Sequence, residues 1–221
     1  MSINVGATKR TKIHRAPSKT VTDIDTVYEI LDAGLVAYVA CVVDGQPYVL
    51  PVGYARDGDR VLFHGSTASR LFKELAKGQP TCFTVMLLDG VVLARSAFES
   101  SMNYRSVMVL GTCEVLEGAD KEAALHRVTT FLLPGREEYA RRAAPKESAA
   151  TMMLALSLEE SSCKVSMKFA DEDPKDLVDP IYSNIWAGYV PIREVFGEPV
   201  TDELAEEKGI PVPEYVKQWT R

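Results

Sequence analysis

The chain has 221 residues, 46% of them hydrophobic, a formal net charge of -6 and a pI of about 5.2. These values predict one globular domain with a hydrophobic core, with or without short appendages. The acidic balance disfavours nucleic acid as a partner, because phosphate binding needs a basic field. No run approaches the ~18 apolar residues that span a bilayer, and no apolar stretch follows the basic N-terminus, so we expect neither a membrane partner nor a secretory signal.

The cysteines disfavour zinc and disulfide scaffolds. Cys41, Cys82, Cys113 and Cys163 are widely spaced and form no CxxC pair. No set of His, Cys and Asp residues has the spacing of metal ligands, so we expect no metal site. Because a chain of this length does not need disulfide staples, a reducing, cytoplasmic location is expected.

The first elements alternate between helix and strand patterns. Residues 1–20 are predicted to form a flexible arm along the body or a partner subunit. A helix is expected to follow Asp23 and to end at Ala33-Gly34. Strands are then predicted over residues 35–43, 46–55 and 60–65, with Asp44-Gly45 as a hairpin turn.

The rest of the chain continues this pattern. A helix is predicted over residues 66–77 and another over residues 119–133. Asp89-Gly90 is expected to be a turn between strands 81–88 and 91–98. Further strands are predicted over residues 104–116, 152–158, 162–169 and 185–192, and residues 171–180 are expected to be a loop. Many short antiparallel strands with few helices predict a closed or nearly closed β-barrel.

The segment His64-Gly65-Ser66-Thr67-Ala68-Ser69-Arg70 lies where a predicted strand meets a predicted helix. Free amides at a helix start favour an anion, and Ser66 and Ser69 add hydroxyl donors. Arg70 can clamp two phosphate oxygens. The alternative is that Ser66 is an N-cap and Arg70 pairs with Glu74 one turn on. The residues alone leave both interpretations open.

Three other segments carry polar or aromatic groups whose role the pattern does not decide. Arg95 interrupts an apolar strand and points either into the core, where its charge needs a partner, or outward. Residues 101–107 combine hydroxyls, an amide and a guanidinium that suit flavin carbonyls, or form an ordinary polar turn. Trp186 beside Gly188 covers a planar cofactor or packs as an ordinary aromatic residue.

Taken together, residues 45–51, 64–70, 93–98 and 101–107, with Trp186-Ala187-Gly188, resemble the FMN-binding family related to pyridoxamine 5′-phosphate oxidase. Nitroimidazole-resistance proteins belong to the same broad group. The resemblance covers about residues 21–191. It implies a mainly β, α+β fold, an antiparallel split β-barrel over residues 21–195, with residues 196–221 as a C-terminal tail. It also implies a homodimer with two FMN sites at the subunit interface.

The resemblance further implies a set of cofactor-binding residues. Ser69 and Arg70, with Ser66 beside them, would hold the phosphate of FMN. The residues that would line the isoalloxazine are Pro51, Val52, Gly53, Tyr54, Phe63 and His64. The residues that would reach the flavin or the neighbouring subunit are Arg95, Ser96, Tyr104, Arg105 and Ser106. Trp186 would lie near the flavin edge.

One position departs from the pyridoxamine phosphate oxidases. Those enzymes carry a basic residue directly after the Ser-Arg pair, where this chain has Leu71. Their C-terminal arginine motif is not evident either, and Arg193 is the only candidate nearby. The sequence therefore disfavours oxidation of vitamin B6.

The leading hypothesis is an FMN-dependent oxidoreductase in which NAD(P)H reduces the flavin and the flavin reduces a small acceptor. No catalytic acid or base is identified, and His64 and Tyr104 are the only candidates for proton transfer. The alternatives are a flavin-binding carrier or sensor without turnover, or a pocket that takes haem or a deazaflavin.

Overall fold

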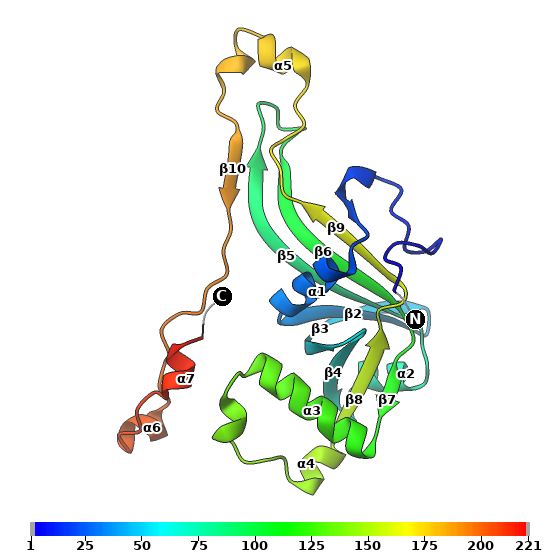
Figure 1. Ribbon diagram of the computed structural model, residues 1–221, viewed down its shortest axis with the longest axis vertical. Coiled ribbons are helices and arrows are strands. Elements are labelled where there is room, and N and C mark those ends of the chain that lie inside the picture. The colour runs from blue at the N-terminus through cyan, green and yellow to red at the C-terminus, as the bar shows by residue number, and fades with distance from the viewer. Residues whose placement is uncertain (1–2, 220–221) are drawn as a thin grey trace.

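The computed structural model describes residues 3–219 (Figure 1). The strands are β1 (Thr20–Val21), β2 (Val36–Val43), β3 (Gln46–Asp57), β4 (Arg60–Ser66), β5 (Thr81–Leu93), β6 (Ser101–Gly111), β7 (Glu114–Leu116), β8 (Thr151–Ser157), β9 (Ser161–Ser166) and β10 (Gly188–Pro191). The α-helices are α1 (Ile24–Ala33), α2 (Arg70–Ala76), α3 (Gly118–Leu132), α4 (Pro145–Ala149), α5 (Pro174–Val178), α6 (Glu203–Glu207) and α7 (Glu214–Lys217). Short 3-10 turns are η1 (Pro17–Lys19), η2 (Arg136–Glu138) and η3 (Tyr182–Asn184).

The strands form one antiparallel sheet in the order β1-β9-β6-β5-β2-β3-β4-β8-β7, with β10 added beside the outer part of β5. Among the described residues the two end strands, β1 and β7, do not pair with each other, so the sheet curls without closing. The split-barrel fold class is therefore confirmed, and of the two expected forms, closed or nearly closed, the fully closed barrel is excluded for the described residues.

The strand β3 changes partner along its length. From Gln46 to Gly53 it pairs with β2, and from Tyr54 to Asp57 it pairs with β4. The end of β4, from His64 to Ser66, pairs only with β8. The sheet is therefore split between the first half of β3 and the end of β4.

Two hydrophobic clusters hold the sheet. The larger one lies inside the curl and includes Val39, Tyr54, Phe63 and Phe83, covered by the amphipathic face of α1. The smaller one lies on the opposite side of β4 and β8, where α3 packs against Leu62 and its neighbours. The helix α3 reaches β3 at Gly53, over which Leu132 packs, whereas residues 46–51 of β3 are exposed.

The expected turn at Asp89-Gly90 is wrong. The strand β5 runs straight through this position with a bulge between Leu88 and Gly90. The Asp89 carboxylate accepts two hydrogen bonds from Arg105 on β6, at 2.7 and 3.0 Å. A cross-strand ion pair thus holds the dipeptide within the ladder, and the actual β5–β6 turn spans residues 94–100.

Other boundaries differ by smaller amounts. The predicted strand 104–116 is two strands, β6 and β7, interrupted at residues 112–113. The helix predicted from residue 66 begins only at Arg70, because residues 66–69 form a turn in which the Ser69 amide donates to the Ser66 carbonyl. The expected loop 171–180 contains the short helix α5, whose N-cap is Asp173.

The described part of the N-terminal arm lies against the body. Val5 and Thr11 are buried, and the Gly6 amide donates to the Ser161 carbonyl at 2.7 Å. At the other end, the chain leaves β10 and reaches α6 and α7 by an extended segment that stands off the sheet (Figure 1). Within residues 3–219, no helix has the length and apolar character needed to cross a bilayer.

Candidate functional site

The junction between β4 and α2 presents free donors. The N-cap residue of α2 is Ser69, whose hydroxyl makes no capping hydrogen bond. The amides of Arg70, Leu71 and Phe72 have no acceptor among the described residues. The Ser66 hydroxyl accepts a hydrogen bond from the Ala68 amide at 3.1 Å. The junction therefore offers three amides, two hydroxyls and a guanidinium to an anion.

Arg70 has no acidic partner among the described residues. Its guanidinium donates to the Tyr48 hydroxyl at 3.1 Å and lies 5.5 Å from the centre of that ring. Glu74, the partner that the alternative interpretation requires, pairs with Lys77 at 2.7 Å instead. The alternative is therefore wrong. Sequence reasoning gave no role to Tyr48, whose signal was its place in the segment 45–51.

His64 lies at the end of β4, on the same side of the sheet as Leu62. Its imidazole keeps access to solvent, yet the protein atoms crowded around it desolvate the charged form and lower its pKa from the ordinary value of 6.5. The imidazole is therefore neutral at pH 7, and it can accept a hydrogen bond or bind a metal centre through a ring nitrogen.

The uncovered side of the sheet, which we call the open face, is apolar. Residues that pair across strands share a side, so β2, β3 and β5 jointly build this face. Its apolar members with about half of their surface exposed are Val36, Tyr38, Val42, Val49 and Met86. Pro51, Gly53, His64 and Ser66 lie along its β3–β4 border. A contiguous exposed apolar area of this kind marks a binding surface.

Two residues expected to line the isoalloxazine point away from the open face. Tyr54 and Phe63 are fully buried in the larger core cluster and pack on Phe83 with ring centres 5.2 and 5.8 Å away. The Tyr54 hydroxyl donates to the Leu31 carbonyl at 2.6 Å. These two residues can reach a ligand only through their backbone. Val52 also faces the core, where it is partly buried.

The remaining predicted residues lie on the β5–β6 hairpin and after it. Arg95 pairs with Glu172 at 2.6 Å, and Arg105 pairs with Asp89, so both guanidinium groups already have carboxylate partners. The buried Nε of Arg95 has no partner among the described residues. The Ser96 hydroxyl accepts from the Glu99 amide at 3.2 Å.

Tyr104, Ser106 and Trp186 remain available to a ligand. Tyr104 and Ser106 alternate with buried Val107 and lie on the open face, opposite Leu88 and Met86. The Trp186 indole is largely exposed and folds back over Gly188, where an added Cβ would come within 2.7 Å of the ring. This close approach explains why residue 188, two positions after the tryptophan, is a glycine.

The structure separates the site residues into two groups. Three strands, β5, β2 and β3, lie between β6 and β4. At ~4.8 Å per strand, Ser106 and His64 are about 19 Å apart along the sheet. The β5–β6 turn is farther still, at the upper end of the molecule, whereas α2 lies at the lower end (Figure 1).

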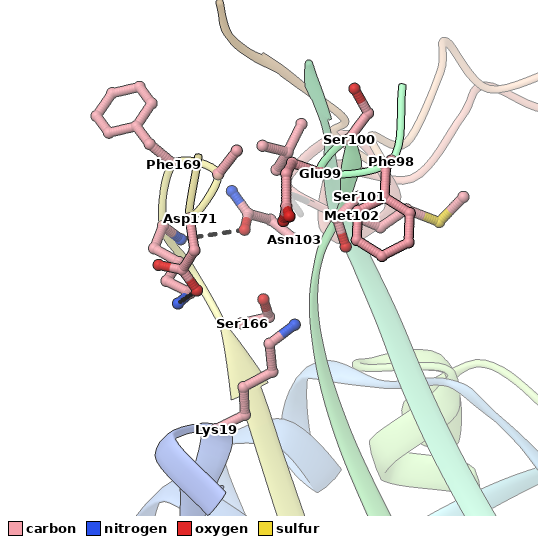
Figure 2. Close-up of a pocket in the computed structure, with 13 residues that line it drawn as sticks. Lys19, Phe98, Glu99, Ser100, Ser101, Met102, Asn103, Ser166, Phe169 and Asp171 are labelled. Atoms are coloured by element: carbon pink, nitrogen blue, oxygen red, sulfur yellow. Dashed lines mark hydrogen bonds and ion pairs between the residues drawn. The ribbon is translucent and has the colours of Figure 1, made fainter. Parts of the chain in front are cut away.

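A pocket of about 190 Å³ lies at the upper end of the sheet (Figure 2). Buried Asn103 accepts a hydrogen bond from the Lys168 amide at 3.1 Å and thereby joins β6 to the chain after β9. Lys19 reaches toward Ser166 from below and also lies 5.6 Å from the centre of the Tyr104 ring. Ser101, Met102 and Asn103 of the predicted segment 101–107 line this pocket, but none of the residues assigned to the flavin or its phosphate does, so the pocket is separate from the junction.

Comparison with known proteins identifies the family. Residues 23–165 match the family model described as pyridoxamine 5′-phosphate oxidase. The chain belongs to this family. A search of curated proteins gives no match.

Two solved structures resemble the family member described here over almost its whole length. The FAD and haem binding protein from Mycobacterium smegmatis is 39% identical, with a TM-score of 0.85, and the match covers 91% of this chain and 97% of that one. The flavocytochrome Anf3 from Azotobacter vinelandii is also 39% identical, with a TM-score of 0.89 and 98% of both chains covered. A candidate 5-nitroimidazole antibiotic resistance protein from Bacteroides thetaiotaomicron, 18% identical with a TM-score of 0.57 over 66% of this chain and 86% of that one, shares the fold.

The structure accounts for the departure at residue 71. Leu71 is buried in the larger core cluster under α2. A basic side chain at this place would have to leave the core to meet a phosphate, and its charge would be costly if it stayed. This family member therefore lacks the second cation that pyridoxamine phosphate oxidases have beside the Ser-Arg pair.

Proposed function

We propose that this protein is a flavin-binding redox protein that holds the flavin phosphate at the β4–α2 junction. The observation that carries the proposal is Arg70, an arginine whose only partner among the described residues is a tyrosine hydroxyl, beside amides that lack acceptors. A phosphate would supply the missing acceptors through charge-assisted hydrogen bonds from Arg70 and Ser69. FMN carries such a terminal phosphate, and the two 39% identical relatives are flavoproteins by name.

The flavin ring would lie on the border of the open face. Pro51 is exposed there, next to Gly53, over which the Leu132 side chain of α3 packs. The split between β3 and β4 leaves backbone groups of β4 unpaired. His64 would stand at the ring edge as a neutral imidazole. A bound flavin supplies hydride and electron transfer, in our proposal from NAD(P)H to a small acceptor. The chain's own residues orient the ring and exclude water.

A homodimer would complete the site. Within one chain, Ser106 on β6 is about 19 Å along the sheet from His64, from the ~4.8 Å spacing of strands, and Tyr104 lies two residues farther along β6. All three lie on the open face, so two copies packed through this face would bring the β6 residues of one near the junction of the other. Trp186 and Arg95 would reach the site in the same way, and the exposed apolar side chains of the face would be buried.

Haem is a second candidate cofactor, favoured by the names of the two similar structures and by His64. A histidine binds haem iron as a neutral imidazole, and the lowered pKa of His64 favours that form. The open face beside it is apolar, as a porphyrin requires. The visible absorbance spectrum of the purified protein separates the candidates, because flavin and haem have different absorption bands.

The decisive experiment is a titration of the cofactor-free protein with FMN, FAD and haem, followed by addition of NADPH. Quenching of flavin fluorescence supports the binding proposal, and its absence refutes it. Steady-state oxidation of NADPH with a quinone, nitro compound or free flavin supports an oxidoreductase. Tight flavin binding without such turnover indicates a carrier or sensor. We also propose a cytoplasmic location for the protein.

A further inference from the structure

The segment between β10 and α6, residues 192–201, touches little of its own chain. We call it the C-terminal strap. All residues from 191 to 200 are exposed, and Val195 and Val200 have 73% and 96% of their surface open to solvent. Phe196 is 43% exposed and its ring lies against Trp219, with ring centres 5.7 Å apart. The two valines of the strap are therefore its least covered apolar side chains.

Both ends of the strap are fixed. At the upper end, β10 pairs with β5 and the Ile192 amide donates to the Asp89 carbonyl at 2.9 Å. At the lower end, the Tyr215 ring stacks on Tyr139 at 4.9 Å, and the Trp219 indole donates to the Pro134 carbonyl at 3.1 Å. The strap thus bridges the two ends of the molecule at a distance from the sheet (Figure 1).

The exposed surface of the chain is too large for a compact monomer. It measures 14,074 Å². A folded monomer of this mass, 24.3 kDa, has about 10,000 Å² by the scaling of surface with mass. The excess is about 4,000 Å², whereas obligate dimers commonly bury ~1,000–2,500 Å² per partner. The strap and the open face both contribute to this exposed surface, and a second copy that packed on them would cover part of it.

We propose that the C-terminal strap of each copy packs across the body of the second copy, so that the two chains of the dimer exchange their C-terminal segments. The inference rests on the dimer of the proposed function. Ten extended residues span up to about 35 Å, enough to cross a domain. The family model ends at residue 165, so the strap is an addition to the matched split barrel. A self-partner is favoured over a foreign one because the same chain carries both the exposed apolar side chains of the strap and the exposed apolar open face.

The test compares two valine substitutions by analytical ultracentrifugation over a range of concentrations. Val200→Asp changes a strap residue, and Val178→Asp changes a valine on α5 with 80% exposure. Because both valines are exposed in one chain, both variants should fold, which circular dichroism checks. We expect Val200→Asp to raise the dimer dissociation constant at least tenfold and Val178→Asp to change it less than twofold.

Hydrogen exchange gives the second measurement. The amides of residues 195–198 and 200 have no acceptor among the described residues, so they should exchange at the unprotected rate unless a partner covers them. We expect slower exchange of these amides at concentrations where the protein is dimeric. A stable dimer with an unprotected strap and no effect of Val200→Asp would overturn the strap proposal and leave the dimer intact. A wild-type protein that stays monomeric with flavin bound would overturn both the strap and the dimer, but not flavin binding.

Discussion

Replacing Arg70 with alanine tests the phosphate site directly. A hydrogen bond to a charged group contributes about 1.5–3 kcal/mol. Because Arg70 is exposed at the surface of one chain, solvent screening places its contribution at the lower end of this range. The expected loss of about 1.5 kcal/mol corresponds to a rise of about 13-fold in the dissociation constant for FMN.

Riboflavin provides the control that isolates the phosphate. It has the same ring and ribityl chain as FMN but no phosphate, so Arg70→Ala should change its affinity less than twofold. Lys73→Ala is the matched protein variant, because it removes a cation from the next turn of the same helix. At physiological salt the Debye length is about 8 Å, so the loss of this more distant charge should have little effect.

The assay is quenching of flavin fluorescence at fixed salt, repeated for both ligands and all three proteins. Equal losses of FMN and riboflavin affinity in Arg70→Ala would show that Arg70 supports the ring or the fold and not the phosphate. An unchanged FMN affinity would show that the guanidinium serves only its contact with Tyr48. Either result refutes the assignment of the phosphate to this junction.

Three further perturbations have expected outcomes. As the pH falls below 6.5, the unfolded chain binds a proton at His64 before the folded chain does, so the free energy of unfolding should decrease. Urea titrations at several pH values should show a smaller decrease for His64→Gln, which lacks this imidazole. An identical pH profile in both proteins would contradict the desolvated imidazole. Gly65→Ala would place a Cβ 2.3 Å from the Phe72 ring and should cost about 1–3 kcal/mol by overpacking, with partial recovery on adding Phe72→Leu; unchanged urea unfolding of the single variant would show that the ring moves freely. Val49→Asp should convert the dimer to monomer in sedimentation while Val178→Asp does not, and a Val49→Asp dimer of normal strength would place the interface elsewhere.

Local sequence patterns predict the fold correctly where no contact with a distant residue overrides them. Asp44-Gly45 adopts the two positive φ angles of a tight hairpin turn, 52° and 79°, and Asp23 accepts the Thr26 amide as an N-cap. Asp89-Gly90 carries the same turn signal as Asp44-Gly45 but lies within β5. Its different outcome depends on Arg105, a residue on another strand. No local rule contains that contact, so the error could not be avoided from the sequence.

The site shows the same limit. Spacing alone left Arg70 with two interpretations, and only the Glu74–Lys77 pair decides against an ion pair between Arg70 and Glu74. The family resemblance placed Tyr54 and Phe63 beside the flavin, but the alternation of β3 and β4 turns both side chains into the core. A resemblance transfers positions along the chain, whereas the direction of a side chain depends on which neighbour covers the sheet.

The change of partner along β3 connects these observations. Because β3 pairs with β2 up to Gly53 and with β4 only from Tyr54, the end of β4 keeps an unpaired edge next to the junction. An unpaired strand edge presents free backbone donors and acceptors, and an exposed apolar face beside it is unfavourable in water, so another molecule can bind by covering both. A flavin can cover the edge and a second chain can cover the face, and neither alone can do both. The same split in the sheet therefore gives a physical reason for proposing the cofactor and the dimer together.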